Sequence, residues 1–366
     1  MEATTITATC ACKAFTFQAD YPNSLLPLPR ALCLCTICRR LSGSCGISYI
    51  IVPPHQTISP TQYSLTAYKS SDVLTRYFCS TCGAHVLVYV TPKKAWHLST
   101  GTWDRTEGLV KWTGSKALGG TLDGGISVWL KDIVASDSVD GTKSDLKRWM
   151  SQDMSGDIQL VPDTAMRALP EPPRKTTKLK AECHCGGVKF YITPPNEASK
   201  TVRSPFPDLM VPYHNSTSSA VENPNNETWW LRADDTKYLA GTCTCTSCRR
   251  ASGFEIQPWA FVPKCNIFKE DGAPLEFNLG TLKQYKSSKG IYREFCSGCG
   301  ATVFWHCDER PELIDVSVGL LDPEQGARVE GWLEWWPDRV SFSEMAVSKS
   351  LVASLEDGLK VWKQKY

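Results

Sequence analysis

Cysteine is the residue type whose spacing in this sequence points most directly to chemistry. The chain holds 17 cysteines, and most of them lie in short Cys-x-Cys or Cys-x-x-Cys groups. Thiolates spaced in this way bind metal ions, and zinc is the ion that several thiolates on a β framework usually select. Disulfides are the weaker interpretation, because the count is odd and the N-terminus shows no secretory signal. The groups of the first half are Cys10-x-Cys12, Cys33-x-Cys35-x-x-Cys38 and Cys79-x-x-Cys82.

The second half of the chain repeats the order and the internal spacing of these groups. Residues 33–43 and 243–253 agree at eight of eleven positions. Residues 68–84 and 285–301 agree at eleven of seventeen. An internal duplication explains both the length and the cysteine count, so we predict two copies of one domain. The groups of the second half are Cys183-x-Cys185, Cys243-x-Cys245-x-x-Cys248 and Cys296-x-x-Cys299.

The first and last groups of each copy together predict a closed four-thiolate site. Alternate residues of a strand face the same side, so each Cys-x-Cys pair is expected to aim two sulfurs at one point. The Cys-x-x-Cys-Gly turn does the same, because its glycine can adopt a positive φ. Four thiolates are typical of structural zinc, which contributes folding free energy directly. The predicted ligands are Cys10, Cys12, Cys79 and Cys82 in the first copy and Cys183, Cys185, Cys296 and Cys299 in the second.

The middle group of each copy supplies three thiolates, and no fourth cysteine recurs at a matching place in both copies. Three protein ligands and an open position are typical of catalytic zinc, which takes water, a thiolate or a carbonyl oxygen there. A structural role, a fourth ligand from elsewhere and an empty site are the alternatives. The arginine pair after each group is expected to offset the thiolate charge or to receive a substrate carboxylate. These residues are Cys33, Cys35, Cys38, Arg39 and Arg40 in the first copy and Cys243, Cys245, Cys248, Arg249 and Arg250 in the second.

The elements that must position the cysteines are predicted to be short strands. Apolar runs rich in β-branched and aromatic residues are bounded by Gly and Pro, which favours short antiparallel strands and a mainly β fold. At the C-terminus, Leu351, Leu355 and Leu359 share one face at helical spacing, which predicts a helix packed on the second domain. The predicted strands lie at residues 47–52, 86–90, 260–262 and 302–305.

The domain boundary is expected where the composition changes. A length of 366 residues suits two domains, and a stretch rich in Pro, Lys and Arg separates the two sets of cysteines. We therefore predict a first zinc domain at residues 1–150, a linker at 151–180 and a second zinc domain at 181–366. Residues 215–235 belong to an insertion in the second copy and are rich in Asn, Ser, Thr and Asp, which predicts a surface loop.

Charge and hydropathy exclude several classes of partner. The formal net charge is +2, so a strong basic field for nucleic acid or for an anionic membrane is not expected. No apolar run approaches the ~18 residues that span a bilayer. The first residues lack the basic flank and apolar stretch of a secretory signal, which favours a cytoplasmic protein. A small-molecule substrate is the expected partner, and the sequence leaves the oligomeric state open.

The combined motif resembles that of a known family. It consists of Cys-His-Cys-Gly at 183–186, Cys-x-Cys-x-x-Cys-Arg-Arg-x-Ser-Gly at 33–43 and 243–253, and Phe-Cys-x-x-Cys-Gly at 78–83 and 295–300. The sequence is similar in these motifs to the glutathione-dependent formaldehyde-activating enzymes, a family that includes the centromere protein V group. The resemblance implies a β-tent fold, a structural four-cysteine zinc and a second zinc on three cysteines. At this second zinc, glutathione adds to formaldehyde to give S-hydroxymethylglutathione, and the family is classed with the carbon-sulfur lyases.

Carried over by matching motif, the four-cysteine sets are the structural ligands and the three-cysteine sets are the catalytic ligands. The first copy departs from the motif, because Lys13 stands where the second copy has Gly186. The first copy is therefore the better candidate for a scaffold. Two further pairs differ between the copies, since Glu255 aligns with Cys45 and Trp259 with Tyr49. The two pockets are expected to differ in polarity and shape.

Two alternatives to S-(hydroxymethyl)glutathione synthase chemistry stay open at this point. A duplicated member with an insertion is compatible with a lyase, dehydratase or isomerase that acts on a specialised pathway intermediate. A zinc-stabilised binding module without catalysis is the alternative from another class. Open, thiol-accessible zinc opposes the binding module, whereas closed metal sites beside an exposed apolar groove favour it.

Overall fold

The fold was analysed in a computed structural model of the whole chain. The structure describes residues 2–130, 133–134, 143–144, 146–151, 176–212 and 221–363. Most of the predicted linker at 151–180 lies outside these residues, as does part of the predicted loop at 215–235.

The first repeat is built from short strands, as the sequence predicts. Its main sheet is antiparallel and has the strand order β4-β8-β7-β6-β5. Beside it lie the hairpin β1-β2 and a parallel sheet in the order β12-β9-β3. The strands are β1 (Ala3–Thr9), β2 (Thr16–Pro22), β3 (Leu28–Cys33), β4 (Tyr49–Ile51), β5 (Leu65–Ser71), β6 (Leu74–Cys79), β7 (His85–Val90), β8 (Ala95–Ser99), β9 (Val110–Lys116), β10 (Ile133–Val134), β11 (Lys143–Ser144) and β12 (Lys147–Arg148).

The second repeat reproduces this sheet strand for strand. Its larger sheet contains the order β17-β22-β21-β20-β19, which matches β4-β8-β7-β6-β5. The register of the outer hairpin shifts between Lys69 and Ser71 in the first repeat and between Lys286 and Ser288 in the second. The duplication is therefore visible in the backbone. The strands are β13 (Leu179–Glu182), β14 (Lys189–Ile192), β15 (Leu231–Arg232), β16 (Lys237–Cys243), β17 (Gln257–Pro263), β18 (Ile267–Lys269), β19 (Leu282–Ser288), β20 (Ile291–Cys296), β21 (Thr302–Cys307), β22 (Leu313–Ser317) and β23 (Leu333–Trp335).

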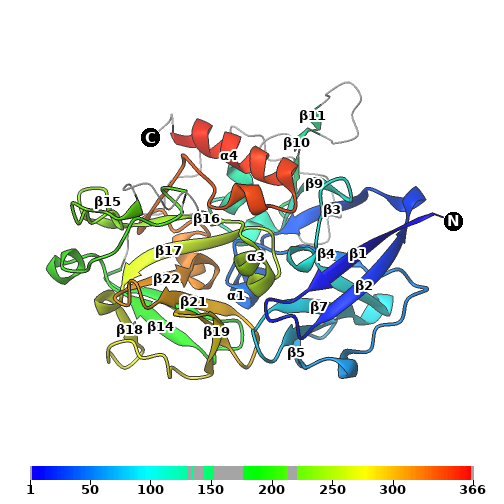
Figure 1. The fold of residues 1–366 in the computed structure, drawn as a ribbon, viewed down its shortest axis with the longest axis horizontal. Coiled ribbons are helices and arrows are strands. Elements are labelled where there is room, and N and C mark those ends of the chain that lie inside the picture. Colours follow the sequence, from blue (N-terminus) through cyan, green and yellow to red (C-terminus); the bar gives the residue numbers. More distant parts are fainter. Residues whose placement is uncertain are drawn as a thin grey trace.

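Two short helices carry the last cysteine of each three-cysteine group. They are α1 (Thr36–Ser42) and α3 (Thr246–Ser252), and Figure 1 shows them side by side at the centre of the molecule. Each helix ends at a glycine of the Arg-Arg-x-Ser-Gly motif. These glycines, Gly43 and Gly253, have φ of 72° and 79°, the left-handed conformation common after a helix. The repeated motif therefore specifies a short helix in each repeat together with the glycine that ends it.

Each of these helices packs against a short turn of the other repeat. The N–H of Gly319, in the turn Val318–Leu320, donates to the carbonyl of Gly43 at 3.0 Å. The N–H of Gly101, in the turn Thr100–Thr102, donates to the carbonyl of Gly253 at 3.2 Å. A Cβ on Gly319 would lie 2.2 Å from the carbonyl oxygen of Ser44, so the approach requires glycine. The two repeats thus form an intramolecular pair whose contact runs through the helices that hold the cysteines.

We expect Gly319→Val to lower the free energy of unfolding by about 2 kcal/mol or more, because an added side chain overlaps backbone that has no room to move. Gly120→Ala is the control, since an added Cβ there meets nothing closer than 3.5 Å. Urea unfolding of both variants tests the contact. Equal midpoints for the two variants would contradict the close packing.

A buried carboxyl group at this contact predicts a dependence of stability on pH. Glu255 is buried, and burial raises the pKa of its carboxyl from 4.5 to about 7. The folded protein therefore binds this proton more tightly than the unfolded chain does. As the pH rises from the pKa of this carboxyl in the unfolded chain through its pKa in the folded protein, the free energy of unfolding falls by up to ~3 kcal/mol. Glu255→Gln should stabilise the protein at about pH 8 and change little at about pH 5. An equal difference in the free energy of unfolding between the variant and the unchanged protein at both pH values would contradict this assignment.

The C-terminal helix is present, and it contacts both repeats where the sequence predicted only the second. Helix α4 (Lys349–Lys363) buries Leu351, Leu355 and Leu359 as expected. It contacts the first repeat, where the rings of Trp129 and Trp362 stand 5.7 Å apart. It also contacts the second repeat, where Lys363 pairs with Asp338 at 2.7 Å. Figure 1 shows α4 along one edge of the molecule, beside β10. Helical spacing identifies the apolar face of a helix but not every surface that covers it, so the predicted contact with the second domain is present and the contact with the first repeat was missed.

Part of the insertion in the second repeat is also more buried than predicted. Trp229 and Trp230, inside the predicted surface loop, have exposed fractions of 4% and 0%. The indole of Trp230 donates to the carbonyl of Ser199 at 3.0 Å. Polar residues dominate the composition of this segment, and the two large apolar side chains among them decide its packing.

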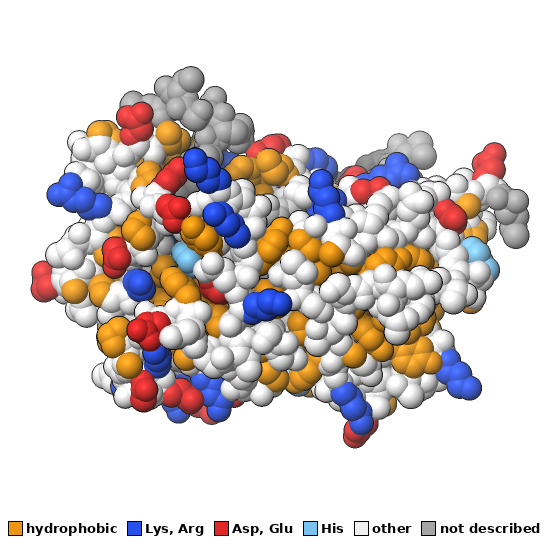
Figure 2. Space-filling model, turned by 60° about the horizontal axis from the view of Figure 1, so that its bottom comes forward, with side chains coloured by type: hydrophobic (Ala, Val, Ile, Leu, Met, Phe, Trp, Pro, Cys, Tyr) orange, Lys and Arg blue, Asp and Glu red, His pale blue; other side chains and the backbone are white. Residues whose placement is uncertain are grey.

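Charged and apolar side chains share the surface. Acidic and basic side chains are interspersed on the face shown in Figure 2, and apolar side chains form a band between them. In the described part of the chain, no helix combines the length and the apolar character needed to cross a membrane.

Candidate functional site

The structure brings each predicted four-cysteine set together. In both sets the four sulfurs lie within 4.8 Å of one another. Neighbouring sulfurs stand 3.6 Å apart for Cys10 and Cys12 and 3.5 Å apart for Cys12 and Cys79. Tetrahedral zinc with Zn–S bonds of ~2.3 Å requires sulfurs roughly 3.8 Å apart, so this donor set fits zinc.

The backbone that places these sulfurs differs from the prediction. Strand β1 ends at Thr9, so Cys10 and Cys12 lie in a turn and not on one face of a strand. In this turn the N–H of Phe15 donates to Cys10 Sγ at 3.3 Å. Lys13 adopts a φ of 66°, close to the 72° of Gly186 in the second repeat. The first copy therefore keeps the turn despite its departure from the motif.

The two three-cysteine sets are also assembled. The Sγ atoms of Cys33 and Cys35 lie 3.6 Å apart, and Cys38 Sγ lies 3.6 Å from Cys33 Sγ. Cys35 precedes helix α1, and its Sγ accepts the N–H of Cys38 at 3.4 Å. Cys245 and Cys248 repeat this contact at 3.4 Å before α3. The described residues add no fourth His, Cys, Asp or Glu ligand to either set. Three thiolates with one open side suit zinc with a free position.

A buried arginine beside each three-cysteine set is the main residue that sequence reasoning missed. Arg76 on β6 and Arg293 on β20 have exposed fractions of 3% and 4%. Nη2 of Arg76 donates to Cys38 Sγ at 3.6 Å, and Nη2 of Arg293 donates to Cys248 Sγ at 3.5 Å. Contacts with Cys33 and Cys35, together with the Arg76 charge, hold the pKa of the Cys38 thiol well below its usual range. The available signal was an arginine shared by both copies of the 68–84 segment.

The four arginines predicted from the motif lie away from the two cavities described below. Arg39 is buried and donates to the carbonyls of Leu34 and Gly120. Arg249 donates to the carbonyls of Gly101 and Trp103 across the contact between the repeats. Arg40 pairs with Glu182 at 3.5 Å, and burial lowers the pKa of Arg250. A role for these four residues in binding a substrate carboxylate stays a prediction, and the contacts of Arg39, Arg40 and Arg249 are structural.

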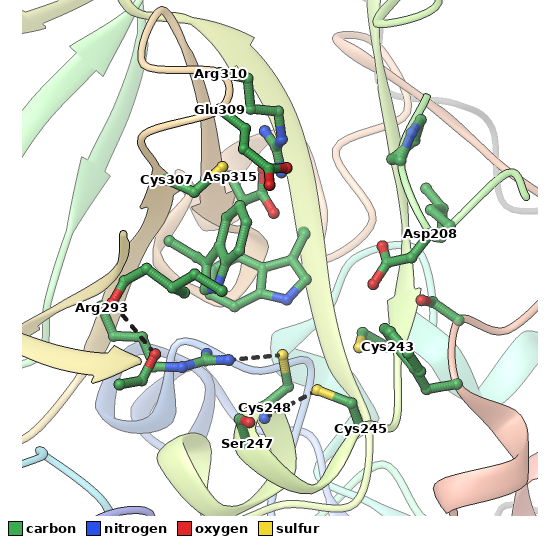
Figure 3. Close-up of a pocket in the computed structure, with 18 of the residues that line it drawn as sticks. Asp208, Cys243, Cys245, Ser247, Cys248, Arg293, Cys307, Glu309, Arg310 and Asp315 are labelled. Carbon is green, nitrogen blue, oxygen red and sulfur yellow. Dashed lines mark hydrogen bonds and ion pairs between the residues drawn. The ribbon is translucent and has the colours of Figure 1, made fainter. Parts of the chain in front are cut away.

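The three cysteines of the second repeat open onto a cavity of about 630 Å³. Figure 3 shows Cys245 and Cys248 at one end and Glu309, Arg310 and Asp315 at the other. Aromatic side chains form much of the wall between these ends. They are Phe206, Trp259, Phe261, Trp305 and Phe342.

Two carboxyl groups of this cavity have raised pKa values. Asp208 lies in the segment between β14 and β15 and faces the cavity near Cys243 (Figure 3), and burial raises its pKa to about 6. Burial also raises the pKa of Asp315 to about 7, although Arg310 lies 2.8 Å away. Both groups therefore exchange protons near neutral pH. Sequence reasoning could not find Asp208, because it stands among prolines and apolar residues and belongs to none of the repeated motifs.

Two of the three cysteines of the first repeat, Cys33 and Cys38, border a second cavity of about 890 Å³, whose lining also includes Tyr49, Arg76 and His97. The hydroxyl of Tyr49 accepts a hydrogen bond from Arg76 Nη1 at 2.6 Å. Tyr49 occupies the position of Trp259, and each is paired with a serine at the end of the neighbouring strand. The two cavities differ in their walls, as the sequence predicts.

Comparison with known proteins places the chain in a family. The family model described as glutathione-dependent formaldehyde-activating enzyme matches residues 5–113 and 230–337, more than half of the chain and once in each repeat. The chain belongs to this family. Both matched segments include a complete three-cysteine group and both cysteines of the Cys-x-x-Cys turn.

Other comparisons add little to the family assignment. No curated protein matches the chain. A crystal structure of a Rhodobacter sphaeroides protein, a structural genomics target, is similar at 18% identity over 43% of this chain and 99% of its own, with a TM-score of 0.23. The fold and the sites of this family member are therefore described from its own structure alone.

Proposed function

We propose that the second repeat is a zinc-dependent active site of the carbon-sulfur lyase type, resembling S-(hydroxymethyl)glutathione synthase. The observation that carries the proposal is the open side of Cys243, Cys245 and Cys248, which faces a cavity large enough for a small molecule. Family membership supports the same activity, with glutathione as the thiol and formaldehyde as the carbonyl compound.

The proposed reaction adds a thiol to a carbonyl carbon, or reverses that addition. One carbon-sulfur bond forms, and the thiol proton is transferred to the carbonyl oxygen, so nothing is oxidised or reduced. Zinc on the three thiolates would supply an acidic open position that favours a bound thiolate or polarises a carbonyl oxygen. We further propose zinc at all four cysteine sets, two per repeat, in a reducing cytoplasm that keeps the thiols available.

The side chains of the cavity have separate tasks in this proposal. Arg293 balances the negative charge of the three thiolates and holds Cys248 in place. The carboxyl of Asp208 is placed to hold the proton that moves between the thiol and the carbonyl oxygen. Trp259 and Trp305 cover the cavity wall and exclude water from the reacting carbon.

We expect Asp208→Asn to lower kcat by roughly 10-fold to 100-fold, the usual effect of losing one acid-base group. The change should also remove the limb of the pH-rate profile near the carboxyl pKa of about 6. Asp308→Asn is a matched control, because Asp308 also lines the cavity but is exposed. Turnover can be followed by NMR exchange between glutathione and its formaldehyde adduct. Equal kcat for the two variants would remove Asp208 from the proposal.

The aromatic wall of the cavity favours a second candidate. Formaldehyde has one carbon and cannot stack on this wall, whereas a flat aromatic carbonyl compound can. A lyase, dehydratase or isomerase that acts on an aromatic carbonyl compound would use the same cysteines and the same wall. Comparing kcat/KM for formaldehyde and for an aromatic aldehyde, each with glutathione, separates the two candidates. The open cysteine sites do not favour a pure binding module, for which closed metal sites were expected.

A further inference from the structure

The cavity of the first repeat is strongly basic. Besides Arg76, which is bound to Cys38, five cationic side chains line it, and no Asp or Glu is among its described lining residues. Four of the five come from the parallel sheet β3-β9-β12, which forms one wall, and the fifth follows β7. The five are Arg30 on β3, Lys111 and Lys116 on β9, Lys147 on β12 and Lys93 in the turn Thr91–Lys93.

These cations lack acidic partners inside the described part of the chain. None of the five forms an ion pair with a described carboxylate. Nε of Arg30 and Nε2 of His97 are buried without a hydrogen-bond partner. Burial and then the charges of Arg30 and Lys93 lower the pKa of His97 to about 4. The cavity therefore holds a concentrated positive potential and unused hydrogen-bonding groups.

The second repeat has different side chains at the equivalent position. Strand β22 replaces β8, so Asp315 stands where the first repeat has His97. The cation of this region, Arg310, is neutralised by Asp315 at 2.8 Å. Three further acidic residues, Asp208, Asp308 and Glu309, line the second cavity. The duplication has thus produced two equivalent cavities, of which the first is lined by basic residues and the second by several acidic ones.

We propose that the cavity of the first repeat binds a small organic molecule that carries at least two phosphate groups. Five unpaired cations around one cavity repel one another, and a multivalent anion relieves this repulsion while it forms charge-assisted hydrogen bonds. The two repeats would then serve different ligands, a phosphorylated molecule in the first and the thiol and carbonyl compound of the proposed reaction in the second. The proposal stands on the first cavity alone and does not depend on the activity proposed for the second.

The test is calorimetric titration of the full-length protein with fructose 1,6-bisphosphate, and with fructose as the uncharged control ligand. We expect saturable binding of about one bisphosphate per chain and none of fructose. Binding should weaken roughly tenfold or more when the ionic strength rises from about 0.02 M to about 0.2 M, because screening shortens the range of these charges. Lys111→Gln/Lys147→Gln should weaken binding at least tenfold, and both lysines are exposed, so the fold is expected to survive.

The matched control is Lys289→Gln, which removes a cation from the cavity of the second repeat. It should leave bisphosphate affinity within about twofold of the unchanged protein. Three results would overturn the proposal: no saturable binding, fructose binding as tightly as its bisphosphate, or equal affinity in the Lys111→Gln/Lys147→Gln variant and the unchanged protein. The last result would mean that the phosphate binds elsewhere, for example at a metal.

Discussion

Cys299→Ser is expected to lower the melting temperature by more than about 15 °C, or to abolish soluble folded protein altogether. Cys299 is buried and belongs to the four-sulfur set of the second repeat. That set connects the turn after β13 to the turn between β20 and β21. Structural zinc on such a set contributes on the order of 10 kcal/mol, more than the whole net stability of most domains.

The control for this variant is Cys265→Ser. Cys265 is exposed and belongs to none of the cysteine sets in the described residues, so its loss should leave the melting temperature nearly unchanged. Thermal unfolding and zinc content are measured on both variants. A Cys299→Ser protein with unchanged melting temperature and unchanged zinc would show that the four sulfurs meet without holding a metal.

Arg293→Met is expected to lower kcat by about 100-fold or more and to weaken zinc binding at the three-cysteine set. The guanidinium is buried and contacts Cys248 Sγ, so its removal leaves the charge of three thiolates without its buried counter-charge. Methionine keeps much of the volume of the side chain, which separates the loss of charge from the loss of packing. Arg293→Lys should restore part of the activity, because it returns the charge without the planar donor group.

The duplication supplies a matched control for this experiment. Arg76→Met makes the same change beside Cys38 in the first repeat. If the chemistry takes place in the second repeat, Arg76→Met keeps most of the turnover while Arg293→Met loses it. The opposite pattern would place the reaction in the first repeat, and equal losses would mean that both sites contribute.

Much of this organisation could be predicted from the sequence, because ligand spacing is a local property. The separations within each cysteine group and their recurrence were enough to predict the pairing of Cys10 and Cys12 with Cys79 and Cys82, which the structure assembles. The strands around them follow from short apolar runs bounded by Gly and Pro. The predicted runs at 86–90 and 302–305 lie within β7 and β21.

The remainder depends on contacts between residues far apart in the chain, which spacing does not encode. Arg76 lies 38 residues from Cys38, and only the pairing of strands brings the two together. The packing of α4 on the first repeat likewise depends on which apolar surface was left uncovered. The different charges of the two cavities arise from single residues such as His97 and Asp315 on equivalent strands. A comparison of strand registers shows this equivalence, whereas the cysteine motif does not.

The central claim is that the three-cysteine set of the second repeat holds a zinc ion at which the reaction takes place. Elemental analysis of zinc in the intact chain and in the Cys243→Ser/Cys245→Ser/Cys248→Ser variant tests it most directly, with glutathione-dependent formaldehyde turnover measured on both. We predict about four zinc ions in the intact chain and about three in the variant, together with the loss of turnover. About two zinc ions in both proteins, or turnover that survives in the variant, would contradict the claim.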